Sequence, residues 1–489
     1  RCGLVTDPRG FDAIDRHEWT AWLRDHGASE RSLASGFMRG IYDLMFAFEG
    51  GEAARRSFSA GVALRGAMRM FFTYRGALFW RMSAGMGDVV FAPLYELLKR
   101  RGVRFRFFHR LRDVKLSPER AGERPHVEAL RFDVQAAIKG GGEYQPLVMV
   151  RDLPCWPARP DYRQLVNGAR KEREGWAFES PWETRRAGTR TLRVGKNFDL
   201  VVLGLSLGSI PDTCAELVAR LPAWAEMVAQ VKTTGTQAFQ LWMRKGLSQL
   251  GWKHDPVNLS GFVEPFDTWA DMSHLAPEES WKEKVETIAY FCSPLPEGEA
   301  RAEGGEAYHA AQYRAVRARA VGFLNEEIGA LWPRAVQREG GFRWELLVGG
   351  DPDAKGEARF DGQFWTANVH GSDRYVLSVP GSSKYRISPL DLSVDNLTIA
   401  GDWTENGFNI GNVEEVSILS LAQRVIAQSG SNSEVVFVPY ERAYEPGFED
   451  MNRRVPDVTK IGQLIGWQPT IALDQILADV IDWCSGGAT

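Results

Sequence analysis

The sequence predicts an α/β fold of mixed α+β character, and three observations carry this prediction. Residues 12–72 repeat apolar side chains at helical spacing, with glycine clusters between the repeats. Residues 197–211 hold a short apolar run bounded by turn formers, which is typical of a strand buried on both faces of a parallel sheet. Residues 230–265 and 283–293 have the pattern of strands in a second sheet. We therefore expect one domain with a parallel sheet, a second domain with a mixed sheet and helices, and a small α/β tail at the C-terminus.

Other elements follow from local patterns. After a glycine turn at Ala84 an amphipathic helix runs to Arg101, and a strand is predicted from Val103. Residues 127–151 have the pattern of a hairpin whose turn is KGGGEY. The proline- and arginine-rich stretch 154–193 predicts a long surface excursion, and an amphipathic helix is expected over residues 308–336.

Composition narrows the class of protein. The 59 basic and 63 acidic residues give a formal net charge of -4, which provides no global field to attract nucleic acid. The five cysteines include no CxxC pair, so we expect neither a disulfide framework nor a zinc site, and a reducing cytoplasm fits them best. The eight histidines lack metal-ligand spacing, so we predict no metal. No apolar run approaches the roughly 18 residues of a membrane-spanning helix, so we predict no transmembrane segment.

One motif near the C-terminal end suits a polar cofactor. In DNLTIAGDWTENGFNIGNVEEVSILSLAQRVI (residues 395–426) an apolar strand ends at the Gly401-Asp402 pair, and a helix begins at the capping residue Asn412. Free N–H groups at the helix start, including that of Val413, attract negative charge. The Asp402 carboxylate can accept hydrogen bonds from sugar or ribityl hydroxyls. A strand-to-helix connection of purely structural importance has the same pattern, and the residues alone leave both interpretations open.

The stretch RYVLSVPGSSKYRI (374–387), followed by DNLTIAGDWTENG, resembles the closing segment of FAD-dependent amine oxidases and phytoene-desaturase-like flavoproteins. AGMGDVVFAPLYELLKRRGVRFRFFHRLRDVKL (84–116) and DLVVLGLSLGSI (199–210) are similar to two further segments of that family. The resemblance covers about residues 11–407. It implies a partial FAD-binding Rossmann-like domain, FAD as cofactor, and a small apolar or amine substrate that loses a hydride from a C–N or C–C bond to the flavin.

The resemblance also implies site residues. Asp402, after Gly401, would bind the ribityl chain, Trp403 and Thr404 would lie beside the isoalloxazine ring, and the backbone at Leu111 would contact the adenine half of FAD. No side-chain acid or base is nominated as catalytic. The family's GxGxxG fingerprint occurs nowhere in the chain. Because the sequence opens on Arg1, we expect the fingerprint to precede that residue and the chain to be incomplete.

From Phe408 onward the sequence resembles a different family, the extended short-chain dehydrogenases that act on nucleotide sugars, such as UDP-glucuronate decarboxylases and sugar epimerases. The segment RRVPD implies that Arg454 would bind the nucleotide pyrophosphate. The catalytic Tyr-x-x-x-Lys of that family occurs only at Tyr95 and Lys99, within the flavoprotein-like helix, where the spacing is expected by chance. The alternative functions are therefore a fragment of an NAD-dependent nucleotide-sugar epimerase or decarboxylase, and a hybrid open reading frame without activity.

Together these patterns predict five segments. Residues 1–83 form a helical part of the substrate domain, 84–225 hold FAD-domain segments with the hairpin and the excursion, and 226–373 form the substrate domain. Residues 374–407 close the FAD domain, and 408–489 form a C-terminal lobe of the short-chain-dehydrogenase kind. The sequence indicates neither the oligomeric state nor the electron acceptor.

Overall fold

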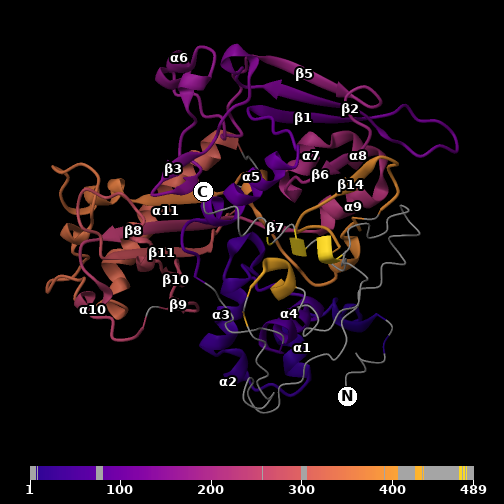
Figure 1. Ribbon diagram of the computed structural model, residues 1–489. Helices are drawn as coiled ribbons and strands as arrows, with labels where there is room; N and C mark the ends of the chain where they lie inside the picture. The colour runs from indigo at the N-terminus through magenta and orange to yellow at the C-terminus, as the bar shows by residue number, and fades with distance from the viewer. Residues whose placement is uncertain are drawn as a thin grey trace. The chain divides into compact units, whose positions relative to one another are not determined.

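The computed structural model describes residues 7, 9–72, 81–255, 257–298, 305–389, 391–405, 425–431, 433, 473–475, 477, 478 and 481. The chain divides into two compact units, Arg1–Thr404 and Glu405–Thr489. The second unit contains few described residues, among them Gln428, whose amide donates a hydrogen bond to Asp474 at 3.2 Å. The predicted α/β fold of mixed character is confirmed by the helices and sheets of the first unit, which Figure 1 shows.

The N-terminal region is helical, as its apolar spacing predicts. Side-chain oxygens of Glu18, Ser29 and Ser35 each accept a hydrogen bond from the first turn of a helix, which satisfies N–H groups that the helix itself leaves free. Trp19, Trp22 and Tyr42 contribute to a small buried core between these helices. The helices are α1 (Trp19–Asp25), α2 (Glu30–Leu33), α3 (Gly36–Leu44) and α4 (Ala60–Phe72).

Hydrogen bonds join this helical region to the segment that precedes the last strand. The buried Asp15 carboxylate accepts hydrogen bonds from the hydroxyl groups of Ser59 and Ser383, both at 2.6 Å. The backbone N–H of Ser59 also donates to the carbonyl of Ser378 at 2.8 Å. Residues more than 300 positions apart in the sequence are thereby held in one unit.

The second sheet is a complete antiparallel structure of five strands in the order β12-β8-β11-β10-β9. Its side chains pack with the long helix α11 (Gly305–Glu326) in the largest core that the described residues form, which contains Phe239, Phe291 and Trp332. The strands predicted for residues 230–265 and 283–293 are confirmed, while the helix expected over 308–336 begins earlier and ends ten residues sooner, at Glu326. The strands are β8 (Thr236–Met243), β9 (Asn258–Leu259), β10 (Thr268–Asp271), β11 (Thr287–Pro294) and β12 (Phe364–Asn368), with the short helix α10 (Leu247–Leu250) between β8 and β9.

The hairpin predicted over residues 127–151 does not form. β2 (Val127–Val134) instead lies between β1 (His109–Leu116) and β5 (Gly188–Arg193), antiparallel to both. The strand after KGGGEY, β3 (Val148–Val150), pairs with β4 (Leu153–Cys155). The local turn pattern was recognisable, but the partner of β2 comes from the end of the predicted excursion, which also contains α6 (Gly168–Arg173).

The strand predicted from Val103 begins only at His109. The preceding helix is as expected, since α5 (Ala92–Arg100) follows a π-helical turn over Gly87–Phe91. Residues 103–107 pair with no strand in the described part of the chain. A strand is defined by its neighbour, so an alternating pattern without one remains irregular.

The parallel sheet of the first unit has two described strands, β6 (Val201–Leu203) and β14 (Leu397–Ile399). One face is buried against the helices α7 (Ile210–Thr213), α8 (Ala215–Arg220) and α9 (Pro222–Gln230). The other face is open: the side chains of Leu200 and Val202 are 75% and 70% exposed. The prediction that this strand is buried on both faces is therefore wrong for the described residues. A further two-stranded pair joins β7 (Thr233–Thr234) to β13 (Tyr375–Val376).

Candidate functional site

The candidate site lies where the two parallel strands end. Parallel strands finish at the same edge of a sheet, and ligands of open α/β sheets bind at that carboxyl edge. β6 and β14 are in register there, and the N–H of Ala400 donates to the carbonyl of Leu203 at 3.0 Å. The indole Nε1 of Trp403 donates to the carbonyl of Leu205 at 2.8 Å. The turn after β14 is thus fastened to the segment after β6.

Gly401 has a backbone that suits glycine alone. Its φ is +154°, and a Cβ at this position would lie 2.8 Å from Nε1 of Trp403. The indole of Trp403 is fully buried, and its ring meets that of Trp224 edge-on at 6.0 Å between centroids. The hydroxyl group of Thr404 donates to the carbonyl of Gly401 at 2.8 Å. The ring of Trp403 and the hydroxyl of Thr404 therefore shape the turn from within.

Asp402 carries the exposed side chain of this turn. Its carboxylate forms no hydrogen bond or ion pair with any residue that the structure describes, while its backbone carbonyl accepts a hydrogen bond from the Arg386 guanidinium. Arg386 also donates to the hydroxyl of Ser378 at 3.1 Å and to the carbonyl of Leu377 at 3.3 Å. Burial lowers the pKa of Arg386, although the Asp402 and Asp15 carboxylates act in the opposite direction. The Arg386 guanidinium is thus bound to the backbone of Asp402, and the Asp402 carboxylate remains free for a ligand.

A cavity of about 640 Å³ lies beside the segment that follows β6. Its walls include Leu207 and Gly208 on one side and His370, Gly371 and Arg374 on the other. The two glycines touch so closely that a Cβ on Gly208 would lie 2.4 Å from the carbonyl oxygen of Gly371. Side chains at these positions would force the two segments apart and open this wall.

Charged and aromatic groups hold the wall of this cavity in place. Arg374 forms an ion pair with Glu297, and both side chains are almost completely buried. Arg374 also donates to the hydroxyl of Thr233 at 2.8 Å. The ring of Trp182 contacts His370 at 5.4 Å between centroids, and burial lowers the pKa of His370. The histidine is therefore expected to be neutral near pH 7.

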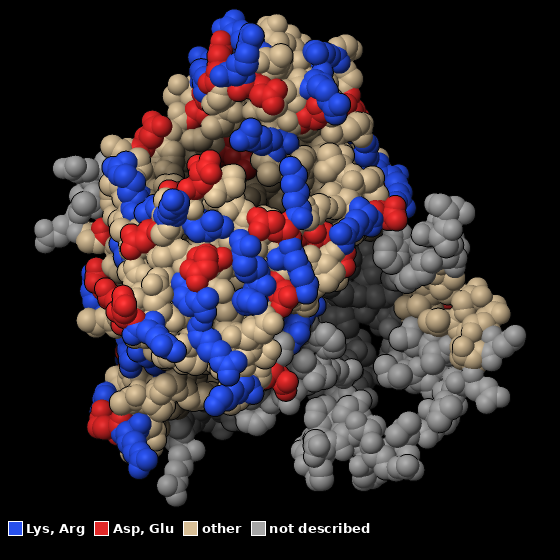
Figure 2. All heavy atoms as spheres, turned by 90° about the vertical axis from the view of Figure 1, so that its left-hand side faces the viewer, with Lys and Arg blue, Asp and Glu red and all other residues tan. Residues whose placement is uncertain are grey.

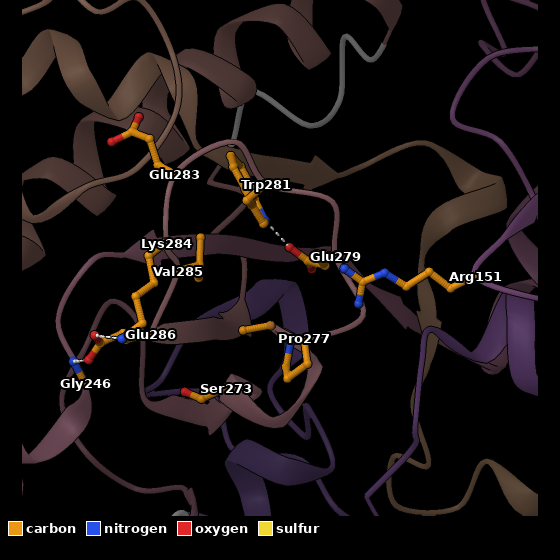
Figure 3. A pocket seen from close by; sticks show the side chains of 11 residues that line it. Arg151, Gly246, Ser273, Pro277, Glu279, Trp281, Glu283, Lys284, Val285 and Glu286 are labelled. Carbon is orange, nitrogen blue, oxygen red and sulfur yellow. Dashed lines mark hydrogen bonds and ion pairs between the residues drawn. The ribbon is translucent and has the colours of Figure 1, made fainter.

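A second cavity, of about 500 Å³, is drawn in Figure 3, and five of its eleven lining residues are charged. Its four acidic and lysine side chains, Glu279, Glu283, Lys284 and Glu286, already have partners. Glu279 accepts hydrogen bonds from the indole groups of Trp242 at 2.6 Å and Trp281 at 2.5 Å, and Glu286 pairs with Lys284 at 2.6 Å. These carboxylates have less capacity for a ligand than Asp402 has.

Predicted site residues fall into three groups. Gly401, Asp402, Trp403 and Thr404 lie together in the turn after β14. Leu111, in β1, packs against the same apolar core that contains Trp403. Three further predicted residues, Asn412, Val413 and Arg454, lie outside the described residues. The roles implied for all of them stay predictions.

The Tyr95–Lys99 pair has a structural explanation. The Tyr95 ring is buried against Phe105 at 4.6 Å between centroids, and the Lys99 amine donates to Gln145 at 3.1 Å. Sequence reasoning missed Arg386, although it lies in the quoted stretch RYVLSVPGSSKYRI, because only the fold shows that it meets the turn.

Among the described residues, no group of three or more His, Cys, Asp or Glu side chains could hold a metal ion. None of the described helices is both long and apolar enough to cross a membrane.

On the face shown in Figure 2, acidic and basic side chains are interspersed.

No family model matches the chain. Two solved structures share 11% sequence identity with it. One is an oxidoreductase from Methanosarcina mazei, with a TM-score of 0.27 over 45% of this chain and 41% of that one. The other, a candidate protoporphyrinogen oxidase from Exiguobacterium sp. 255-15, has a TM-score of 0.36 over 82% and 66%. Similarity at this level carries no argument about fold or function.

Sequence comparison finds curated decarboxylases. UDP-N-acetyl-alpha-D-glucosaminuronate decarboxylase of Bacillus cytotoxicus is 37% identical over 123 residues, which are 25% of this chain and 38% of that protein. UDP-glucuronic acid decarboxylase 1 of Danio rerio is 35% identical over 77 residues, 16% of this chain and 17% of that protein. The chain thus spans well under half of these curated relatives. The matches include both kinds of protein that the sequence resembles, oxidoreductases and nucleotide-sugar decarboxylases. Part of the chain is similar to nucleotide-sugar decarboxylases.

Proposed function

We propose that the unit Arg1–Thr404 is the greater part of an FAD-dependent oxidoreductase that takes a hydride from a C–N or C–C bond of a small apolar or amine substrate. The observation that carries this proposal is the exposed, unpaired carboxylate of Asp402 at the carboxyl edge of β6 and β14. The motif that contains it resembles the FAD-binding turn of the amine-oxidase family. Geometry and resemblance therefore select the same residue.

The residues of the turn fit a flavin nucleotide in part. The Asp402 carboxylate can accept hydrogen bonds from ribityl hydroxyl groups, and Gly401 has no side chain to block their approach. Because the Trp403 ring is fully buried, a bound flavin would meet this residue through its backbone. The partly buried Arg386 would offset part of the negative charge that Asp402 and a diphosphate bring together.

The remaining requirements are space and an apolar surrounding. FAD, when bound, supplies the hydride acceptor, so this chain needs only to orient the substrate bond and to exclude water. The cavity of about 640 Å³ beside Leu207 and Gly208 provides room for a substrate at the same sheet edge. His370 and Trp182 would form part of its wall, and a neutral His370 would not repel a protonated amine.

The proposal is tested by titrating the purified chain with FAD and following flavin absorbance and the melting temperature. We expect a rise in melting temperature with FAD, because a ligand that binds the folded state stabilises it. Asp402→Ala should weaken binding by about tenfold or more, since it removes a charge-assisted hydrogen bond. Asp353→Ala, at an exposed carboxylate elsewhere, is the matched control and should bind normally. No FAD-dependent change in the wild-type chain would overturn the proposal.

A second candidate function concerns the C-terminal segment. The motif RRVPD and the resemblance of residues 408–489 to nucleotide-sugar enzymes support binding of a nucleotide sugar by this segment, with Arg454 on the pyrophosphate; part of the chain is similar to UDP-sugar decarboxylases. UDP-glucuronate should then slow hydrogen exchange in this segment, and Arg454→Ala should abolish the effect. If neither FAD nor UDP-glucuronate binds, the chain is better described as a hybrid without activity.

A further inference from the structure

A third cavity, of about 700 Å³, shares no lining residue with the candidate cofactor site and is lined in part by Glu172 of α6 and by Trp156, which follows β4. Its walls are dominated by aromatic rings from several loops. Six of them are Phe107, Phe108, Tyr144, Trp156, Tyr162 and Phe178. A volume of this size accommodates an organic ligand of two or three fused rings.

The rings form a continuous basket with their edges turned toward one another. Phe108 meets Tyr144 at 4.9 Å and Phe178 at 5.0 Å between centroids, both edge-on. Phe107 contacts Tyr144 at 5.5 Å. Tyr144 is buried, whereas Phe107, Phe108 and Phe178 are only partly buried. Ring surface that packs against no other side chain therefore faces the cavity, and a flat ring would cover it.

Hydrogen bonds fix the wall before any ligand arrives. Phe108 has a left-handed backbone, with φ of +59°, and its carbonyl accepts a hydrogen bond from the N–H of Gln135 at 2.8 Å. The Gln135 amide donates to the carbonyl of Phe178 at 2.7 Å. The Arg110 guanidinium donates to the carbonyls of Ser180 at 2.6 Å and Glu183 at 2.5 Å. A strained residue held by such a network indicates a wall organised in advance for binding.

The charges at the cavity favour a cation. Glu172 and Glu179 line it and are exposed, and their carboxylates form no hydrogen bond or ion pair within the described chain. Arg159 is the one basic side chain among the lining residues described. The guanidinium of Arg185 and the amine of Lys171 lie over the Trp176 ring, at 5.0 and 4.3 Å from its centroid. The face of this ring is therefore occupied by cations of the protein itself. The two free carboxylates, together with aromatic faces, suit a positively charged ring.

We propose that this cavity binds a flat aromatic cation, such as a quaternised or protonated nitrogen heterocycle. The ring would lie among Phe108, Tyr144 and Phe178, and its positive charge would lie toward Glu172 and Glu179. This site is independent of the FAD proposal, because its lining shares no residue with the turn at Asp402 or with the cavity beside Gly208.

The test compares three bicyclic probes on the full chain by isothermal titration calorimetry: N-methylquinolinium, quinoline at pH 8, and naphthalene-2-sulfonate. We expect saturable binding that is strongest for the cation and weakest for the anion. The double variant E172Q/E179Q should weaken binding of the cation by about fivefold and leave binding of quinoline unaffected, because only the charge attraction is removed. Glu278→Gln, at an exposed carboxylate outside the cavity, is the control and should change nothing.

A second variant tests the rings. Phe178→Leu should weaken the binding of quinoline and of N-methylquinolinium alike. The melting curve of this variant shows whether the variant folds. The carboxylate variant decides the question if Phe178→Leu does not fold, since its positions are exposed. Absence of saturable binding by all three probes, equal affinity for cation and anion, or a cation affinity unchanged by E172Q/E179Q would each overturn the proposal.

Discussion

The five-stranded antiparallel sheet and the parallel pair of the first unit differ in how completely the described chain covers them. The five-stranded antiparallel sheet has its strands and its covering helix α11 within residues 236–368, and the core residues of its central strands, such as Phe239 and Phe291, are fully buried. The parallel pair joins β6 to β14 across almost two hundred residues, and Leu200 and Val202 remain exposed on one face. Parallel sheets are normally covered on both faces. The region that resembles the FAD domain is thus the incompletely covered one, whereas the region expected to hold substrate is self-contained.

This difference predicts where stability resides. Burying apolar side chains is the main favourable contribution to folding, so the antiparallel core should respond strongly to loss of volume. The open face of the parallel pair should respond hardly at all. Four substitutions test this comparison, in order of decreasing expected effect on the free energy of unfolding.

Phe239→Ala should have the largest effect. Phe239 is fully buried in β8, stacks on Phe291 at 4.8 Å and meets Phe266 edge-on at 4.7 Å. Its removal leaves a cavity and should lower the free energy of unfolding by about 3–5 kcal/mol. Urea denaturation measures this. A loss below about 1 kcal/mol would contradict the view that this sheet carries the main core.

Asp267→Asn should stabilise the protein in a pH-dependent way. Asp267 is buried next to the antiparallel core; burial raises its pKa to about 8, and the nearby Asp43 carboxylate adds to the shift. A folded-state pKa above the unfolded value of about 3.9 means that stability is full below pH 4 and is lost as the pH rises toward 8. The amide variant should gain on the order of 2 kcal/mol at pH 8 and much less at pH 5.

Urea denaturation of Asp267→Asn and the wild type at both pH values measures this gain. The variant retains an oxygen that can accept the hydrogen bond from the Thr268 hydroxyl, which the carboxylate accepts at 2.8 Å. Asp353→Asn, at an exposed carboxylate, is the control. The same pH dependence in Asp267→Asn and in the wild type would show that Asp267 is charged in the folded protein at no cost.

Trp403→Phe should have a moderate effect. The change removes the hydrogen bond from the indole to the Leu205 carbonyl and reduces a fully buried volume. We expect a loss of about 1–2 kcal/mol, together with faster hydrogen exchange in the turn after β14. If exchange in that turn is unchanged, Trp403 does not fasten it to the segment after β6.

Val202→Thr should have the smallest effect, within about 0.5 kcal/mol, because the side chain is 70% exposed. Val201→Thr, at the adjacent buried position, is the matched control and should cost more. Thermal melting distinguishes the two. Equal losses would show that the open face of the parallel pair is covered in solution.

Much of this fold could be predicted from local patterns. The helices of residues 12–72 and the strand that ends at Ile399 follow from apolar spacing, and Gly401-Asp402 was recognisable as a motif. The partner of β2 was not predictable, because β5 lies some sixty residues further along the chain and no local signal identifies it. Arg386 and the Gly208–Gly371 contact were missed for the same reason: they depend on pairing between distant segments.

We propose that the carboxyl edge of β6 and β14 binds FAD. Hydrogen exchange of the purified chain, with and without FAD, tests it most directly because it locates the response. FAD should slow exchange in residues 203–208 and 400–404 and leave β8 and β11 unchanged, and this effect should be lost in Asp402→Ala. Unchanged exchange at both segments in saturating FAD, or protection confined to another part of the chain, would contradict it.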